Sequence, residues 1–311
     1  MSQPQPDFSH DNIRTLRGTV FRYLFLLCAL LSIMTTAAIV LTLLVDAVDF
    51  FAQVSLVEFL TGTEWNPTHD PVSFGVLPLV SGTLVITVGS ALVALPIGLL
   101  TAIYLSEYAS DRQRSYLKPA LEVLAGVPTV VYGYFALVYV TPALDTVLPV
   151  NLSTFNALSA SIMVGIMIIP MVSSISEDAM SAVPDSLRQA SYGLGATKFT
   201  VSTSVVVPAA LSGIFSSFIL ALSRAIGETM IVAIAAGQTP RLIDLTDPAG
   251  LFTNSVQTMT AAMVQIGTGD LVGQGPAYKS LFAVGLTLFV ITFAMNLISE
   301  LVASRYREVY R

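Results

Sequence analysis

The sequence predicts an all-α, polytopic membrane protein with six transmembrane helices. Hydrophobic residues make up 54% of its 311 positions and charged residues only 11%, and the mean hydropathy is +0.76. These values lie outside the range of water-soluble globular domains. Several uncharged stretches are also long enough to cross a hydrocarbon core of roughly 30 Å, for which about 20 helical residues suffice.

Six stretches have the length and composition of membrane spans. We place them near residues 22–46, 76–105, 119–142, 157–177, 210–236 and 279–302. The first is predicted to be a retained anchor, because the uncharged stretch after Arg22 exceeds the apolar core of a cleaved signal peptide. Segment 248–269 is a possible seventh span, but its polar side chains favour an external or re-entrant segment. Residues 1–21 and 303–311 are predicted to be tails.

The positive charges set the predicted orientation, because Lys and Arg near span ends stay on the cytoplasmic side. With six spans, Arg241 and Lys279 fall on one side and Arg224 lies within a span. The remaining basic residues all fall on the opposite side: Arg14, Arg17, Arg22, Arg112, Arg114, Lys118, Arg188, Lys198, Arg305, Arg307 and Arg311. Both termini and the loop 180–208 are therefore predicted to be cytoplasmic.

The polar loop between the fourth and fifth predicted spans has a distinctive spacing. Gln189-Ala190-Ser191 is followed by Gly195, and Val205-Val206-Val207-Pro208 ends the segment. Ser186 and Gln189 have the spacing of a capping box at a helix start. Gly195 can supply the positive φ that ends a short helix, and a second helix is expected to run toward Pro208. A helix, a glycine bend and a second helix at the membrane surface form a shape suited to a groove on another protein.

Arg224 and Glu228 place two charges inside the predicted fifth span. Four residues apart, they share one helix face, and an arginine at mid-bilayer costs roughly 2.5–3.5 kcal/mol on insertion scales. Its planar fork of donors fits a tetrahedral oxyanion. One hypothesis is that Arg224 contacts an anion on a translocation path. Glu228 would then neutralise it when the path is empty and accept a hydrogen bond from a protonated phosphate. The alternative is an ion pair that only fixes helix packing.

Other motifs predict a bend in the third span and argue against nucleotide, metal and catalytic sites in this chain. Gly126 and Pro128 predict a bend, and a possible hinge, in the third span. The sequence contains no G-x-x-x-x-G-K-[ST] run to cradle nucleotide phosphates, so powered transport would need a separate ATPase. His10, His69 and Cys28 are too few and too scattered for a metal site, and no nucleophile with a base stands out as catalytic.

The spacing of the 189–208 loop resembles the EAA loop of ABC importer permeases, which inserts into the partner ATPase. Gln189 stands where that family usually has Glu. The resemblance implies a type I ABC importer permease fold, with no cofactor in this chain and ATP bound by the partner subunit. It also implies ATPase coupling by one group of residues: Arg188, Gln189, Ala190, Ser191, Gly195, Ala196 and Pro208.

Further runs are similar to those of phosphate-specific transport permeases, in particular their C-type subunit: Trp65–Pro67 (WNP), Ile103–Tyr108 (IYLSEY), Leu124–Gly133 (LAGVPTVVYG) and Ser223–Met230 (SRAIGETM). This resemblance implies a first span and outer loop over 22–75 and a permease core over 76–302, in a prokaryotic cytoplasmic (inner) membrane. It implies a heterodimer with an A-type permease, ATPase subunits and an extracytoplasmic phosphate-binding protein, and no nucleic-acid partner. Arg224 and Glu228 would lie on the phosphate path.

Rival functions remain open. The cargo could be another oxyanion, such as sulfate, molybdate or phosphonate. A secondary transporter without an ATPase is disfavoured, because no inverted repeat is visible and the polar loop is predicted to be cytoplasmic. An intramembrane enzyme is disfavoured by the lack of a paired catalytic set.

Overall fold

The computed structural model describes residues 11–244, 246–269 and 275–305. The long helix α1 (Asp11–Phe51) comes first, followed by the short helix α2 (Leu56–Thr61). Two short antiparallel strands, β1 (Trp65–Asn66) and β2 (Ser73–Phe74), form the next loop. Trp65 packs edge-on against Phe74, and Phe74 packs against Phe50 at the end of α1. This aromatic cluster ties the loop to the first helix.

Among the described residues, five helices are long and apolar enough to cross a membrane: Gly18–Phe51, Leu77–Tyr108, Thr129–Val147, Ala157–Ser181 and Pro276–Leu301. A sixth candidate is a pair of helices bent by 71°, Lys198–Ala209 and Leu211–Ile226. The spans predicted near 22–46, 76–105, 157–177 and 279–302 are confirmed. The third and fifth differ from their predicted bounds.

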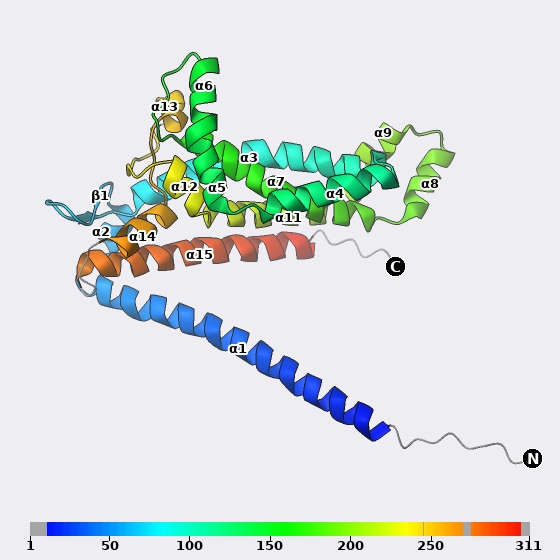
Figure 1. The fold of residues 1–311 in the computed structure, drawn as a ribbon, viewed down its shortest axis with the longest axis horizontal. Helices are drawn as coiled ribbons and strands as arrows, with labels where there is room; N and C mark the ends of the chain where they lie inside the picture. The colour runs from blue at the N-terminus through cyan, green and yellow to red at the C-terminus, as the bar shows by residue number, and fades with distance from the viewer. Residues whose placement is uncertain (1–10, 245, 270–274, 306–311) are drawn as a thin grey trace, which may run out of the picture.

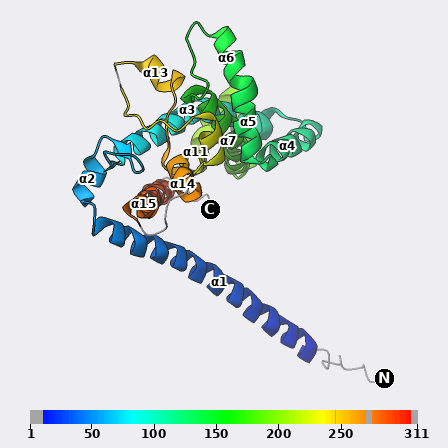
Figure 2. The same cartoon turned by 60° about the vertical axis from the view of Figure 1, so that its left-hand side comes forward.

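The central pair of helices is α3 (Leu77–Ile103), which ends in the π-helical turn η2 (Tyr104–Tyr108), and α7 (Ala157–Ser181). In Figure 1 they run along the same axis as α4 (Asp111–Gly126), α11 (Leu211–Ile226) and α15 (Pro276–Arg305). Helix α1 leans away from α15 in both views (Figures 1 and 2). The buried core therefore lies around α3 and α7, whereas the most apolar stretch of α1 has no buried residue within this chain, and Ala47 and Phe50 near the end of α1 are buried.

The third span begins later than the sequence predicted. The 119–142 prediction is wrong at its start, because α4 ends at Gly126 and α5 (Thr129–Phe135) begins a separate segment. A proline disfavours helical geometry in the residue before it, and Val127 has an extended backbone with ψ 129°. The span continues through the π-helical turn η3 (Ala136–Val140) and α6 (Thr141–Val147). It stands across the axis of α3 and α7 in both views.

The fifth span is broken at both ends of α11. Before it, α9 (Lys198–Val201), the π-helical turn η4 (Ser202–Val206) and α10 (Val207–Ala209) form the other arm of the bent pair. After it, the chain leaves the helix at Gly227 and resumes in α12 (Met230–Ala235). The continuous 210–236 helix that the sequence predicted is therefore wrong, and Arg224 lies in the last turn of α11 rather than at mid-span.

Segment 248–269 forms two short helices, α13 (Pro248–Thr253) and α14 (Met259–Thr268), joined by an extended stretch. Neither meets the length of a span, in agreement with the preference for six spans over seven. Helix α14 packs against α3, α12 and α15, and Met259 and Ala262 are buried.

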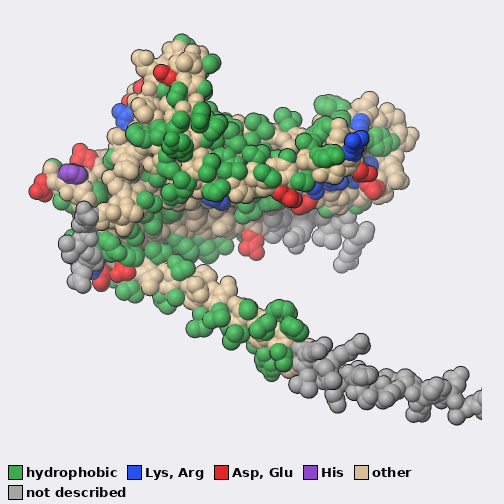
Figure 3. Space-filling model, viewed as in Figure 1, with side chains coloured by type: hydrophobic (Ala, Val, Ile, Leu, Met, Phe, Trp, Pro, Cys, Tyr) green, Lys and Arg blue, Asp and Glu red, His purple; other side chains and the backbone are tan. Residues whose placement is uncertain are grey.

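The two ends of the molecule differ in charge. The helix α8 (Asp185–Gly193) and α9 lie at one end, and the strand pair lies at the other (Figure 1). The first described turn of α1 and the last turn of α15 point toward the α8 end. Lys and Arg side chains gather near α8 and α9 in Figure 3.

Candidate functional site

The helix break after α11 is stabilised by the carboxylate of Glu228, which accepts hydrogen bonds from backbone groups at the start of α12. One carboxylate oxygen of Glu228 accepts hydrogen bonds from the backbone N–H groups of Met230 and Ile231, at 3.1 and 3.3 Å. These are orphan donors at the start of α12. The hydroxyl of Thr260 donates to the Glu228 carbonyl at 2.7 Å. Glu228 thus acts as a cap that allows the backbone to leave the helix inside the protein.

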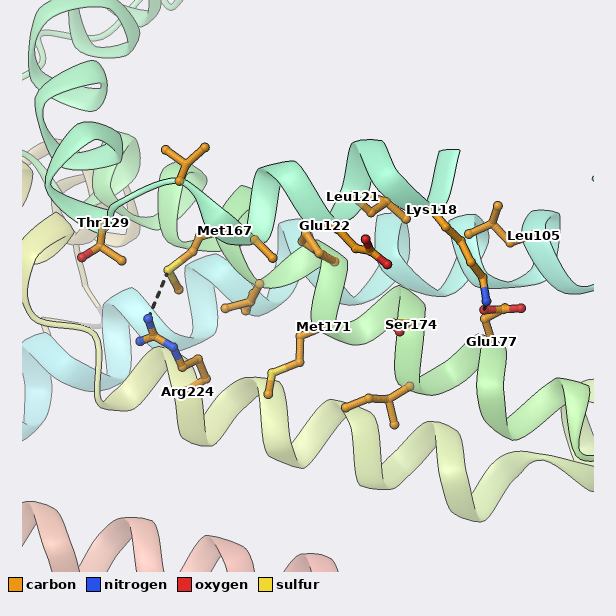
Figure 4. Close-up of a pocket in the computed structure, with 15 residues that line it drawn as sticks. Leu105, Lys118, Leu121, Glu122, Thr129, Met167, Met171, Ser174, Glu177 and Arg224 are labelled. Atoms are coloured by element: carbon orange, nitrogen blue, oxygen red, sulfur yellow. Dashed lines mark hydrogen bonds and ion pairs between the residues drawn. The ribbon is translucent and has the colours of Figure 1, made fainter. Parts of the chain in front are cut away.

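Arg224 pairs with the second carboxylate oxygen of Glu228 at 2.8 Å. The side chain of Glu228 is 2% exposed, whereas that of Arg224 is 43% exposed. The other guanidinium nitrogen lies 3.7 Å from the sulfur of Met167 (Figure 4). Both Glu228 oxygens are therefore occupied in this conformation. The predicted contact between Glu228 and a protonated phosphate would require the pair to open, while Arg224 remains accessible.

A cavity of about 470 Å³ lies beside Arg224, between α4, α7 and α11. Figure 4 shows Arg224 at one end and Lys118 beside Glu177 at the other, with Met167 and Met171 along the wall. Glu177 is buried and forms ion pairs with Arg114 and with Lys118 of α4. The arrangement offers a fixed guanidinium to an anion in a mostly apolar chamber, where a charge-assisted hydrogen bond is strong.

The predicted hinge residues lie at the rim of this cavity. Gly126 ends α4, and Pro128 is the N-cap of α5. Val127 and Thr129 beside them line the cavity. The bend is confirmed, and its movement stays a prediction.

The predicted coupling loop contains the expected helix, bend and second helix. Gly195 has φ +81°, which confirms the predicted left-handed position. The capping box of Ser186 with Gln189 is wrong, because Pro184 occupies the N-cap and α8 begins two residues earlier than that box requires. Pro184 presets the backbone for the first turn without a side-chain cap. A complete capping box occurs instead at Ser110 and Gln113, at the start of α4.

The coupling residues fall into two groups. Gln189, Ala190, Gly195 and Pro208 are exposed, and Ser191 and Ala196 are half-buried. Arg188 faces inward, with its side chain only 15% exposed. Sequence reasoning missed the apolar residues that project from the loop: Tyr192, Phe199 and, at 90% exposure, Leu194. Their signal was large apolar side chains within a polar loop, which usually mark a contact surface.

Sequence reasoning also missed Glu107, in the turn η2 that follows α3. Its carboxylate is 4% exposed and pairs with Arg188 at 2.9 Å. A lone carboxylate after an apolar span was the available signal. Its partner, 81 positions away, could not be read from the sequence.

Comparisons with known proteins agree with this geometry. Residues 94–308 match the family described as "Binding-protein-dependent transport system inner membrane component". The chain is 34% identical over 281 residues to the "Probable ABC transporter permease protein YqgH" of Bacillus subtilis, covering 89% of this chain and 88% of that protein. It is 32% identical over 321 residues to the "Phosphate transport system permease protein PstC" of Mesorhizobium japonicum, covering 94% and 95%. PstC of Haemophilus influenzae is 31% identical over 309 residues, covering 93% and 94%.

Solved structures show the same fold. The crystal structure of a bacterial alginate ABC transporter in complex with an alginate-bound periplasmic protein contains a chain with a TM-score of 0.64 at 15% identity, covering 94% of this chain and 98% of that one. An inward-facing MetNI methionine ABC transporter contains a chain with a TM-score of 0.54 at 17% identity, covering 75% and 95%. With the broken fifth span and the exposed loop between spans, these matches show that the chain is a multi-pass membrane protein and belongs to the family of inner-membrane components of binding-protein-dependent transport systems, the ABC importer permeases that include PstC.

Proposed function

We propose that the chain is the permease subunit of an ATP-driven phosphate importer and forms half of its translocation pathway. The observation that carries this proposal is Arg224, which is held by a buried carboxylate and exposed to a 470 Å³ cavity. A guanidinium keeps its charge at any working pH and presents a planar fork to a tetrahedral oxyanion. Several relatives of the chain are named as phosphate permeases, which supports phosphate over other oxyanions.

In this mechanism Glu228 orients Arg224, and Arg224 binds the anion. The ion pair with Glu228 leaves one side of the guanidinium toward the cavity. Phosphate entering the cavity would bind that side, and the apolar wall near Met167 would exclude competing water. Release follows when the cavity opens at its other end.

The energy comes from a separate ATPase. The sequence has no nucleotide-binding loop, so in this proposal ATP is bound by the partner subunit rather than by this chain. Exposed Leu194, Tyr192 and Phe199 supply an apolar docking surface around the predicted Gln189–Ala196 segment. ATP binding would pull this loop and tilt the spans from inward-open to outward-open, and hydrolysis would reset them.

The remaining partners follow from the family. A second, A-type permease would complete the pathway, and an extracytoplasmic binding protein would deliver phosphate. The gathering of basic side chains near α8 supports a cytoplasmic location for that end, toward which the first described turn of α1 and the last turn of α15 point. Both termini would then be cytoplasmic, and the family match supports a prokaryotic inner membrane.

Phosphate uptake by the assembled complex tests the proposal. Complexes with wild-type chain, Arg224→Ala or Arg224→Lys are reconstituted in liposomes with ATP inside and the loaded binding protein outside. A charge-assisted hydrogen bond contributes about 1.5–3 kcal/mol, so Arg224→Ala is expected to reduce uptake by about tenfold or more. Arg224→Lys keeps the charge without the fork and is expected to fall between. Arg112→Ala, an exposed arginine on α4, is the matched control.

Two results would contradict different parts of the proposal. Near-normal uptake by Arg224→Ala would remove Arg224 from the pathway. Equal transport of sulfate or molybdate by the wild-type complex would make the cargo a broader set of oxyanions and leave the permease function intact.

A further inference from the structure

Arg188 is a half-buried residue at the start of the coupling loop that bonds to several groups at once. Its guanidinium donates to the carboxylate of Glu107 at 2.9 and 3.3 Å. It also donates to the carbonyl oxygens of Val183 at 2.6 Å and Met180 at 2.9 Å, at the end of α7. Arg188 therefore joins α8, the inner end of α3 and the last turn of α7 through charge-assisted bonds, which are the shorter and stronger kind.

The burial of the pair separates it from the docking surface. Glu107 is 4% exposed and Arg188 is 15% exposed, whereas Leu194 at the tip of the loop is 90% exposed. Arg188 also contacts Asp185 at 3.2 Å, but that carboxylate is 85% exposed and water screens the contact. Of the two ion pairs of Arg188, the one with Glu107 is therefore the one that holds α8 against the end of α3.

The second arm of the loop reaches the same turn. Lys198, at the start of α9, lies 5.1 Å above the ring of Tyr108, the residue after Glu107. A cation over an aromatic face is a favourable contact. Both arms of the loop thus meet η2, the last turn of α3, so a displacement of the loop reaches α3 across space as well as along the chain.

From α3 the displacement passes to the cavity wall. Helices α3 and α7 are packed so closely that a Cβ on Gly165 would lie 2.9 Å from the Cβ of Val93. Such close packing resists sliding, since interiors transmit strain rather than absorb it. Helix α7 in turn supplies Met167, Met171 and Glu177 to the cavity beside Arg224.

We propose that the Glu107–Arg188 pair is a positioning contact that makes the coupling helix α8 and the inner end of α3 one rigid unit. A pull on α8 by the ATPase then moves α3, α7 and the cavity wall together. Without the pair, the ATPase still docks on the loop and hydrolyses ATP, but the loop deforms and its displacement does not reach α3. The inference rests on the proposed function, because it assumes that an ATPase pulls on the loop.

The test compares phosphate moved per ATP hydrolysed in assembled complexes in liposomes. Glu107→Gln, Arg188→Met and the double variant remove the pair, and Asp178→Asn, an exposed carboxylate near the end of α7, is the matched control. ATPase retained per permease is measured on the same preparations. For Glu107→Gln we expect ATPase retention within twofold of wild type and a ratio of phosphate to ATP about tenfold lower. Arg188→Met also loses the bonds to the Val183 and Met180 carbonyl oxygens, so its ratio is expected to fall at least as far. The double variant is expected to lose no more than Arg188→Met, because Glu107→Gln then removes a contact that is already broken.

Arg188→Lys provides a second route if Glu107→Gln does not assemble. Lysine keeps the charge near Glu107 but lacks the fork that also reaches the two carbonyl oxygens. A ratio between those of wild type and Arg188→Met is expected. A general loss of folding would lower assembly without lowering the ratio in the complexes that do form.

The outcomes separate this inference from the proposed function. If the wild-type complex shows no ATP-dependent phosphate uptake, the proposed function fails. If wild-type uptake is normal but the ratio of phosphate to ATP in Glu107→Gln and Arg188→Lys equals that of Asp178→Asn, the rigid link is refuted. Multiplicative losses in the double variant would also refute it, because the two residues would then act independently.

Discussion

Replacement of Glu228 by Gln tests whether this residue holds Arg224 or binds the cargo. The glutamine carbonyl can still accept from the N–H groups of Met230 and Ile231, so the cap on α12 is preserved. Its amide instead places a donor against the Arg224 nitrogen that now lies 2.8 Å from a carboxylate oxygen. Hydrogen bonds to charged groups contribute about 1.5–3 kcal/mol. Because Arg224 is 43% exposed and water can solvate it, we expect about 2 kcal/mol of destabilisation, toward the lower end of that range.

Two further variants at the same break calibrate this value. Glu228→Ala also removes the cap, which adds about 1 kcal/mol, for a total of about 3 kcal/mol. Thr260→Val removes the hydroxyl bonds to the Glu228 carbonyl and to the Thr258 hydroxyl and leaves the ion pair intact, so about 1 kcal/mol is expected. Denaturant-induced unfolding of the purified complex in nanodiscs, followed by intrinsic fluorescence, ranks the three variants.

The transport assay distinguishes the two roles of Glu228. If Glu228 orients Arg224, Glu228→Gln lowers phosphate uptake while sulfate discrimination is unchanged. If Glu228 instead accepts a hydrogen bond from a protonated phosphate, the variant loses preference for phosphate over sulfate. Equal destabilisation by Glu228→Gln and Thr260→Val would refute the ion-pair reasoning, because the charge would then contribute nothing beyond a neutral hydrogen bond.

Three other perturbations have defined outcomes. Gly195→Ala forces a side chain into φ +81°, which costs about 1–2 kcal/mol. We expect about tenfold weaker ATPase binding in a pull-down titration, whereas Gly193→Ala should change ATPase binding little. The hydroxyl and N–H of Thr246 hold the pKa of Asp244 below its ordinary value; these contacts are complete above the ordinary pKa and are lost as pH falls through the lowered one. Thr246→Val should raise that pKa in a carboxyl ¹³C titration, and no change would contradict the hydroxyl's part. Gly165→Val overpacks the α3–α7 contact by about 1–3 kcal/mol and should lower the unfolding midpoint, so an unchanged midpoint would argue against close packing there.

Local features of the chain were readable from the sequence. Hydropathy predicted the membrane location and most spans. A backbone in lipid must satisfy its own hydrogen bonds, and a long apolar helix is one of the few structures that does so. The left-handed position of Gly195 and the bend at Gly126 and Pro128 also followed from local sterics. The capping box at Ser186 failed because Pro184, two residues earlier, had already fixed the helix start.

Features that depend on distant residues were not readable. The broken fifth span depends on the hydroxyl of Thr260, 32 positions away, which satisfies the Glu228 carbonyl where the helix is interrupted. A hydropathy window therefore joined two helices into one and placed Arg224 at mid-span.

The sequence by itself determined a six-span membrane protein with a polar loop and two charges near the fifth span. Only the tertiary structure decided that Glu228 caps a helix and turns Arg224 toward a cavity, and that Arg188 faces Glu107 rather than solvent. The physical reason is the range of the interactions. Solvation and backbone sterics act within a few residues, whereas a buried ion pair forms only where packing brings distant helices together and removes water from both charges.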